Sequence, residues 1–170
     1  MSKPPVLEVS VRIAAAPEDV FPYFTDPARH VGWMGSEAEL EPVPGGAYCL
    51  RMGDGFGVSG TFQEIDSPRR LSVTWGWAPG AGQAVLGDDH ARDDDLPPGS
   101  TRVVVLLEAQ DGGSRLTLQH HELPTDELRE GHRVAWETYL ARLAVRAAGG
   151  DPGPDPHSGS VGDGARKAES

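Results

Sequence analysis

The first segment of the chain alternates strictly between apolar and polar residues. In residues 6–13, VLEVSVRI, the apolar side chains of Leu7, Val9, Val11 and Ile13 occupy every second position. Side chains at i and i+2 of a strand point to the same face, so this segment is predicted to be a half-buried strand. Further strands are predicted at 38–43, 46–52, 57–66, 70–77, 101–109 and 115–121. Short turns rich in Gly, Pro and Asp separate most of them, which favours an antiparallel meander.

Helical spacing appears at two places. After the first strand, Pro17 and the acidic residues behind it predict the start of a short helix, which Asp26-Pro27 ends before a second short turn at 30–33. The last element is a long helix with Thr125 as its N-cap and Gly149-Gly150 at its end. Its apolar stripe consists of Trp136, Leu140, Leu143 and Ala147, and Tyr139 widens it.

Composition divides the chain into one domain and its extensions. Residues 1–6 form an N-terminal extension and 7–148 the domain, which includes a loop at 78–100. That loop contains the acidic stretch DDHARDDD at 88–95, typical of a solvated segment. Residues 149–170 have too few apolar side chains to offset the cost of ordering, so they are predicted to be a disordered tail. Removal of residues 151–170 is expected to leave the melting temperature essentially unchanged.

The charge and the cysteine content exclude several classes of protein. The formal net charge is −11, which disfavours a nucleic-acid surface because phosphate contacts need clustered Lys and Arg. No apolar run approaches about 18 residues, so no membrane insertion is expected. The single cysteine and the absence of a signal-peptide pattern predict a cytoplasmic protein.

Two motifs that suggest chemistry do not fit their surroundings. GFGVSG, at 55–60, matches the dinucleotide fingerprint, but TFQEI behind it has strand character where a nucleotide site needs a helix. Cys49 alternates with Tyr48 and Leu50, so it is predicted to be a buried structural thiol on the face opposite to theirs.

The histidines give no metal site. His120 and His121 are adjacent on a predicted strand and therefore point to opposite faces. His30, His90 and His132 are predicted to lie on the surface. We assign no cofactor, metal or catalytic residue. His120 is expected to point inward, where it is either a general acid or base or a core histidine whose hydrogen bonds are satisfied by its neighbours.

Five sequence pieces in order carry a family resemblance. They are APEDVFPYFTDPARHVGW, PVPGGAY, FQEIDSPRRLSVTW, GSRLTLQHHELP and the last helix with Trp136 and LARL. Over residues 7–148 the chain resembles the bacterial group similar to the C-terminal domain of the activator of heat shock protein 90 ATPase, within the START-like (SRPBCC) superfamily. The resemblance implies an α+β helix-grip fold, in which a curved antiparallel sheet wraps around a long C-terminal helix and two short helices follow the first strand. Ala135 stands where such proteins often have Gly, and the acidic loop resembles an insertion.

The helix-grip layout implies a cavity between the concave face of the sheet and the last helix. The side chains predicted to line it from the sheet are Tyr48, Leu50, Met52, Phe62, Val73, Trp75, Trp77, Val105, Leu118 and His120. From the helix, Trp136, Tyr139, Leu140 and Leu143 would face them. These residues either fill a core or line an apolar pocket.

Three functions fit these observations. The resemblance favours a module that binds a hydrophobic small molecule, in a regulatory or stress-response role, over an enzyme. One alternative is an enzyme similar to polyketide cyclases and aromatases, with His120, Tyr48 or Tyr139 moving protons. The other alternative is a co-chaperone-like interaction protein. The sequence also allows a homodimer or a complex with a protein partner.

Overall fold

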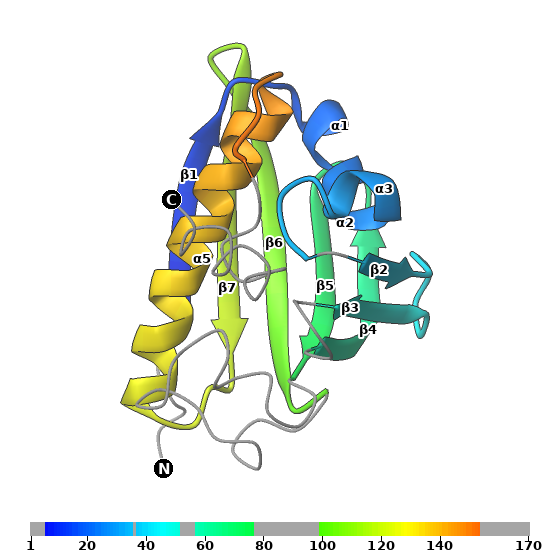
Figure 1. Cartoon of the computed structure of the whole chain (residues 1–170), viewed down its shortest axis with the longest axis vertical. Coiled ribbons are helices and arrows are strands. Elements are labelled where there is room, and N and C mark those ends of the chain that lie inside the picture. Colours follow the sequence, from blue (N-terminus) through cyan, green and yellow to red (C-terminus); the bar gives the residue numbers. More distant parts are fainter. Residues whose placement is uncertain (1–5, 36, 52–56, 77–98, 154–170) are drawn as a thin grey trace, which may run out of the picture.

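A curved antiparallel sheet forms the body of the protein (Figure 1). The computed structural model describes residues 6–35, 37–51, 57–76 and 99–153. The strands are β1 Leu7–Ile13, β2 Glu37–Leu40, β3 Ala47–Arg51, β4 Gly57–Asp66, β5 Arg70–Trp75, β6 Thr101–Gln110 and β7 Gly113–His121. They are ordered β1-β7-β6-β5-β4-β3-β2, so a meander runs from β2 to β7 and β1 pairs with its last strand. The predicted alternation in β1 is confirmed, because Leu7, Val9 and Ile13 are buried.

The glycines of the GFGVSG motif that are described belong to a strand. Gly57 and Gly60 lie in β4, and the same strand continues to Asp66 where a nucleotide-binding loop would need a helix. A Cβ atom at Gly60 would lie 1.9 Å from the carbonyl oxygen of Thr74. Gly60 is therefore required by the close approach of two strands, and not by a bound phosphate.

Three short helices follow β1, where one helix and one turn are predicted. They are α1 Pro17–Val20, α2 Pro22–Thr25 and α3 Pro27–His30. Each begins with a proline, which is suited to a first helical position because it lacks the N–H that would stay unbonded there. The predicted turn at 30–33 is present, with the Trp33 N–H bound to the His30 carbonyl oxygen at 3.1 Å, but Pro22 and Pro27 each begin a short helix that was not predicted separately.

The long helix α5, Asp126–Ala147, lies across the β1 and β7 side of the sheet (Figure 1). The Thr125 side chain accepts a hydrogen bond from the Leu128 N–H at 3.1 Å, which confirms the predicted N-cap. Gly149, with φ at 99°, follows the helix in the left-handed conformation that favours glycine. Sheet and helix together confirm the α+β helix-grip fold. Within the described residues, no helix is both long enough and apolar enough to cross a membrane.

The start of the predicted C-terminal tail has defined contacts. The Arg142 guanidinium donates to the carbonyl oxygens of Pro152 and Gly153 at 3.2 and 3.0 Å. Asp151 pairs with Arg146 at 3.4 Å. The described residues 149–153 therefore have hydrogen-bond partners on α5, and the disorder of the tail stays a prediction. Residues 154–170 and most of the acidic loop, 77–98, lie outside the described residues.

Because of these contacts, the effect of shortening the C-terminal tail on stability should depend on the residue at which the chain ends. A chain that ends at Gly150 is expected to be about 1 kcal/mol less stable than one that ends at Gly153, since it loses two acceptors of a charged donor. Urea unfolding of the two chains measures the difference. Identical midpoints would show that the Arg142 contacts contribute nothing to stability.

Candidate functional site

The side chains predicted to line a cavity are buried between the sheet and α5. None of those described is more than 3% exposed. They are Tyr48, Leu50, Phe62, Val73, Trp75, Val105, Leu118, His120, Trp136, Tyr139, Leu140 and Leu143. Met52 and Trp77 lie outside the described residues. The described side chains of this set therefore lie together in one close-packed interior.

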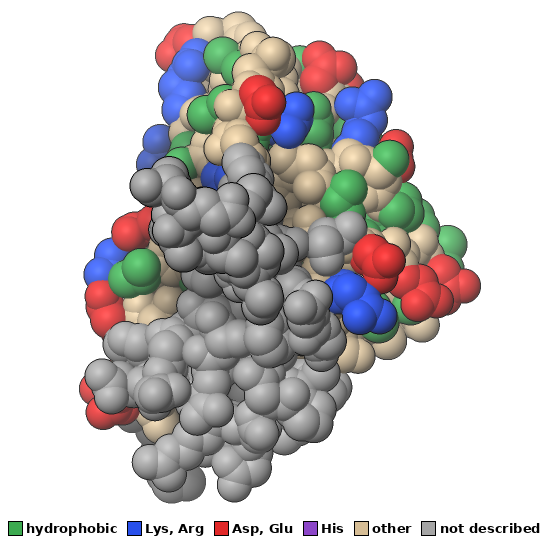
Figure 2. Space-filling model, viewed as in Figure 1, with side chains coloured by type: hydrophobic (Ala, Val, Ile, Leu, Met, Phe, Trp, Pro, Cys, Tyr) green, Lys and Arg blue, Asp and Glu red, His purple; other side chains and the backbone are tan. Residues whose placement is uncertain are grey.

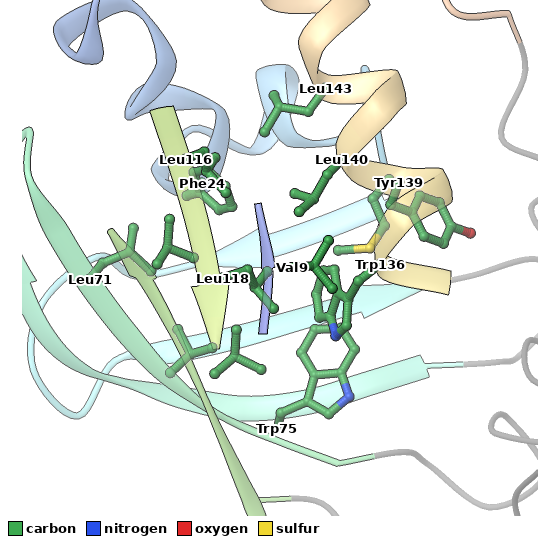
Figure 3. Packing of buried hydrophobic residues seen from close by; sticks show 14 of the residues in the cluster. Val9, Phe24, Leu71, Trp75, Leu116, Leu118, Trp136, Tyr139, Leu140 and Leu143 are labelled. Atoms are coloured by element: carbon green, nitrogen blue, oxygen red, sulfur yellow. The ribbon is translucent and has the colours of Figure 1, made fainter. Parts of the chain in front are cut away.

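Trp75, on β5, is at the centre of an aromatic cluster built from four elements. Its ring centroid lies 4.9 Å from that of Trp136 on α5, 5.8 Å from that of His120 on β7 and 6.3 Å from that of Tyr48 on β3. We call Tyr48, Trp75, His120 and Trp136 the aromatic cluster. Figure 3 shows the indoles of Trp75 and Trp136 together, whereas the Tyr139 ring points away from Trp75. Tyr139 is thus buried as expected but does not face the cluster.

A chain of hydrogen bonds crosses the aromatic cluster. The indole N–H of Trp136 donates to Nδ1 of His120 at 3.2 Å. Nδ1 is therefore unprotonated, and Nε2–H donates to the Thr101 hydroxyl at 2.8 Å. That hydroxyl donates in turn to the carbonyl oxygen of Trp75 at 2.8 Å. These partners fix which group donates and which group accepts in each of the three hydrogen bonds.

His120 is held neutral by its surroundings. Burial lowers its pKa well below the ordinary value, and charge on His132 and His121 would lower it further. With both ring nitrogens bonded inside the protein, His120 offers no nitrogen to a bound molecule in this arrangement. The geometry therefore matches a satisfied core histidine, and the sequence analysis did not identify its partner Thr101.

His30 was predicted to lie on the surface, and the structure corrects this. Its side chain is fully buried at the end of α3. Nδ1–H donates to the Met34 carbonyl oxygen at 3.1 Å, and Nε2 accepts from the Tyr48 hydroxyl at 2.7 Å. Burial lowers the pKa of His30 to about 4 and raises the pKa of Tyr48. This pair connects α3 to β3 through neutral groups.

His132 was also wrongly predicted to be a surface residue. It is 1% exposed on α5, and its Nδ1–H donates to the Leu128 carbonyl oxygen at 2.9 Å. Burial lowers its pKa to about 4. Its ring meets that of His120 edge to face, with centroids 4.9 Å apart. His30, His120 and His132 are called the interior histidines below; His90 lies outside the described residues.

The interior histidines do not form a metal site. Among the described residues, no group of three or more His, Cys, Asp or Glu side chains converges on a common point. His121 follows His120 in β7 but is half-buried and hydrogen-bonded to Gln119 at 3.3 Å. The interior can therefore supply aromatic surface and hydrogen bonds between neutral groups.

A separate cleft of about 680 Å³ lies between α3 and the strands β2 and β3. We call it the α3 cleft. Its described lining consists of Pro27, Ala28, Val31, Glu37, Ala38, Glu39, Cys49, Leu50, Arg51 and Gly57. Cys49 points away from the interior, as predicted, but the expectation of a buried thiol was wrong: it is partly exposed, with Sγ 3.8 Å from the Ser59 hydroxyl.

Fold and interior together define a START-like (SRPBCC) protein of the helix-grip type. The family model "Activator of Hsp90 ATPase homolog 1-like protein" (AHSA1) matches residues 14–148, so the chain belongs to this family. A search of curated proteins found no match.

Solved structures agree with this assignment. An AHSA1-like protein from Rhizobium etli is 37% identical, with a TM-score of 0.65, and the match covers 92% of this chain and 91% of that one. The AHSA1 protein from Silicibacter pomeroyi is 28% identical, with a TM-score of 0.65 and coverage of 85% and 98%. CalU16 from Micromonospora echinospora is 21% identical, with a TM-score of 0.63 and coverage of 85% and 76%, a similarity that shows the shared fold.

Proposed function

We propose that this protein binds an apolar small molecule between the sheet and α5. The observation that carries the proposal is the aromatic cluster, in which Tyr48, Trp75 and Trp136 bring rings from three elements together. Aromatic side chains offer large and rigid apolar contact area, which is typical of small-molecule sites. His120 and Thr101 are bonded to their neighbours, so the surface offered to a ligand is mainly apolar.

Binding at the aromatic cluster requires the interior to open. The cluster is at most 3% exposed, so a ligand must replace contacts between α5 and the sheet. Burial of about 300 Å² of apolar ligand surface is favourable by about 7.5 kcal/mol, at about 25 cal/mol per Å². Opening and immobilisation reduce this gain, so we expect affinities of about micromolar or weaker for a generic apolar compound.

The proposal is tested by tryptophan emission. Titration with a panel of apolar aromatic compounds is expected to change the emission of the wild-type protein and of Trp33→Phe, because Trp33 lies outside the cluster, with its indole N–H bound to the Tyr23 carbonyl oxygen at 3.0 Å. In the double variant Trp75→Phe/Trp136→Phe the response should be largely lost, because both indoles of the aromatic cluster are removed. Mass spectrometry of an organic extract of the purified protein provides a second measurement. An empty extract together with unchanged emission across the panel would contradict the proposal.

Catalysis by His120 is a separate hypothesis with a separate test. Its bonded ring nitrogens favour binding over proton transfer. If the protein converted an aromatic polyketone and His120→Ala abolished that turnover, the interpretation as a binding protein without catalysis would be wrong.

A further inference from the structure

We propose that a cleft on the outer face of the sheet, the face turned away from α5, is a second binding site, which takes small zwitterions such as α-amino acids. We call it the outer cleft. Its volume of about 640 Å³ lies within the range of about 300–1,000 Å³ that is usual for ligand pockets. Its described lining comes from β4, β5, β6 and the residues beside them, and includes none of α5. Thr101 belongs to this lining, but its hydroxyl is bonded to His120 and to the Trp75 carbonyl oxygen in the interior.

Strand alternation and register place the side chains of the outer cleft on one face. In β5, Ser72 and Thr74 alternate with Trp75, which packs against α5, so both hydroxyls lie on the opposite face. The Ser72 hydroxyl donates to Glu64 of β4 at 3.5 Å, which places that carboxylate beside it. Arg102 of β6 lies directly opposite Thr74, and directly opposed residues of antiparallel strands share a face. The outer cleft is therefore continuous across three strands.

A β-bulge adds an amide group to the lining. The register of β4 against β5 shifts between Phe62 and Glu64, so Gln63 and Glu64 together oppose Ser72. Gln63 is exposed and lines the outer cleft. Its side-chain amide forms no hydrogen bond with any other described residue. This side of the cleft can therefore donate and accept hydrogen bonds from a polar ligand.

One positive and one negative side chain of the outer cleft have no charged partner. Arg70 is bound to Glu64 at 3.1 Å, so this pair compensates itself. The side chains of Arg102 and Glu122 form no ion pair or hydrogen bond with any other described residue. Arg102 lies directly opposite His121, and Glu122 is the next residue along the chain. The two opposite charges are therefore neighbours that do not bind each other.

Glu122 lines the outer cleft because the strand has ended before it. β7 ends at His121, and Glu122 has a φ of 72°, in the left-handed region, so the alternation of β7 does not extend to it. Its side chain is exposed and contributes to the same lining as Arg102. Both charges can therefore contact one small molecule.

A zwitterion matches this arrangement. A guanidinium donates two parallel hydrogen bonds to a carboxylate, and a carboxylate accepts from an ammonium group. Arg102 would bind the carboxylate of an α-amino acid, and Glu122 its ammonium group. The net charge of −11 disfavours a free anion, whereas a zwitterion carries no net charge. Figure 2 shows acidic and basic side chains interspersed on the α5 side of the molecule as well, so the local placement of charge decides what binds.

The experiment follows backbone amide shifts of Thr74 and Gly99 by NMR at pH 7 during titration with three matched compounds. L-glutamine carries both charges and an uncharged polar side chain, N-acetyl-L-glutamine lacks the ammonium group, and L-glutaminamide lacks the carboxylate. L-glutamine is expected to bind with a dissociation constant of about 1 mM, as befits a small and polar ligand. Each of the other two compounds should bind about threefold more weakly, the scale of one exposed ion pair.

Two variants separate the two charges. Arg102→Gln should weaken L-glutamine and N-acetyl-L-glutamine by about threefold and leave L-glutaminamide unchanged. Glu122→Gln should weaken L-glutamine and L-glutaminamide and leave N-acetyl-L-glutamine unchanged. The matched controls are Arg115→Gln and Glu108→Gln, which remove the same charges from an exposed pair farther along β6 and β7. Neither control should change any of the three affinities.

Other outcomes overturn the proposal. Absence of shifts at Thr74 and Gly99 with all three compounds would overturn the site. Equal affinity for the three compounds would overturn the recognition of a zwitterion, and this comparison needs only the wild-type protein. Equal effects of Arg102→Gln and Arg115→Gln would overturn the role of Arg102. Tryptophan emission with apolar compounds tests the interior site separately, so failure of one site is distinguishable from failure of the other.

Discussion

Lowering the pH from 7 to 5 is expected to destabilise the protein by about 6 kcal/mol. The unfolded chain binds protons on its histidines near pH 6.5, whereas burial lowers the pKa of His30 and His132 to about 4 and that of His120 well below its ordinary value. The unfolded state therefore binds more protons below pH 6.5, and stability falls as the pH falls through this range. Each interior histidine contributes about 2 kcal/mol at pH 5.

Urea unfolding at several pH values measures this dependence. Between about pH 4 and pH 6.5, three such histidines give a slope of about 4 kcal/mol per pH unit, and above pH 6.5 their contribution is constant. His132→Leu should reduce the slope by about a third. Val134→Ala, on the exposed face of the same helix, should leave it unchanged. Equal unfolding free energies at pH 7 and pH 5 would show that the interior histidines are not held neutral.

Trp75→Ala is expected to destabilise the protein by about 3–5 kcal/mol. The side chain is 2% exposed and is surrounded by Trp136, His120 and Tyr48, so truncation leaves a cavity that the neighbouring rings cannot fill without moving. A tryptophan in the wall of an existing open pocket would cost less, about 1–3 kcal/mol, because it already lacks neighbours on one side. Thermal and urea unfolding at pH 7 distinguish the two values.

Rescue by a small aromatic molecule makes this test specific. An apolar cavity left by truncation stays dry and can bind a ligand of matching size. Indole should therefore raise the melting temperature of Trp75→Ala more than that of Val134→Ala, which keeps the cluster intact. If Trp75→Ala lowered the free energy of unfolding by less than about 1 kcal/mol and its melting temperature did not change with indole, the aromatic cluster would be loosely packed.

The amino-acid sequence by itself determined the architecture, because periodicity is a local property. A period of two predicted all seven strands, with their ends displaced by a few residues in places. The Thr125 cap and the Gly149 stop predicted α5 to within about two residues. The three short helices were only partly predicted, because Pro22 ends one turn and begins another, and a single proline indicates either event.

Burial of the histidines was decided by tertiary structure. His30 is buried because α3 packs beside β3 and brings it to the Tyr48 hydroxyl, 18 residues later in the chain. For His132 a signal was present: Leu128, His132, Trp136 and Leu140 follow one another at helical spacing, which places His132 on the buried stripe.

The contents of the interior likewise depended on contacts between distant elements. Alternation and helical spacing placed Trp75, His120 and Trp136 inward, because each property is read within a single strand or helix. The chain of hydrogen bonds from Trp136 through His120 to Thr101 required three elements to meet at distances of 2.8 to 3.2 Å. Periodicity predicts which face of an element is buried, but the partner that it meets there depends on how the elements pack, which only the tertiary structure decides.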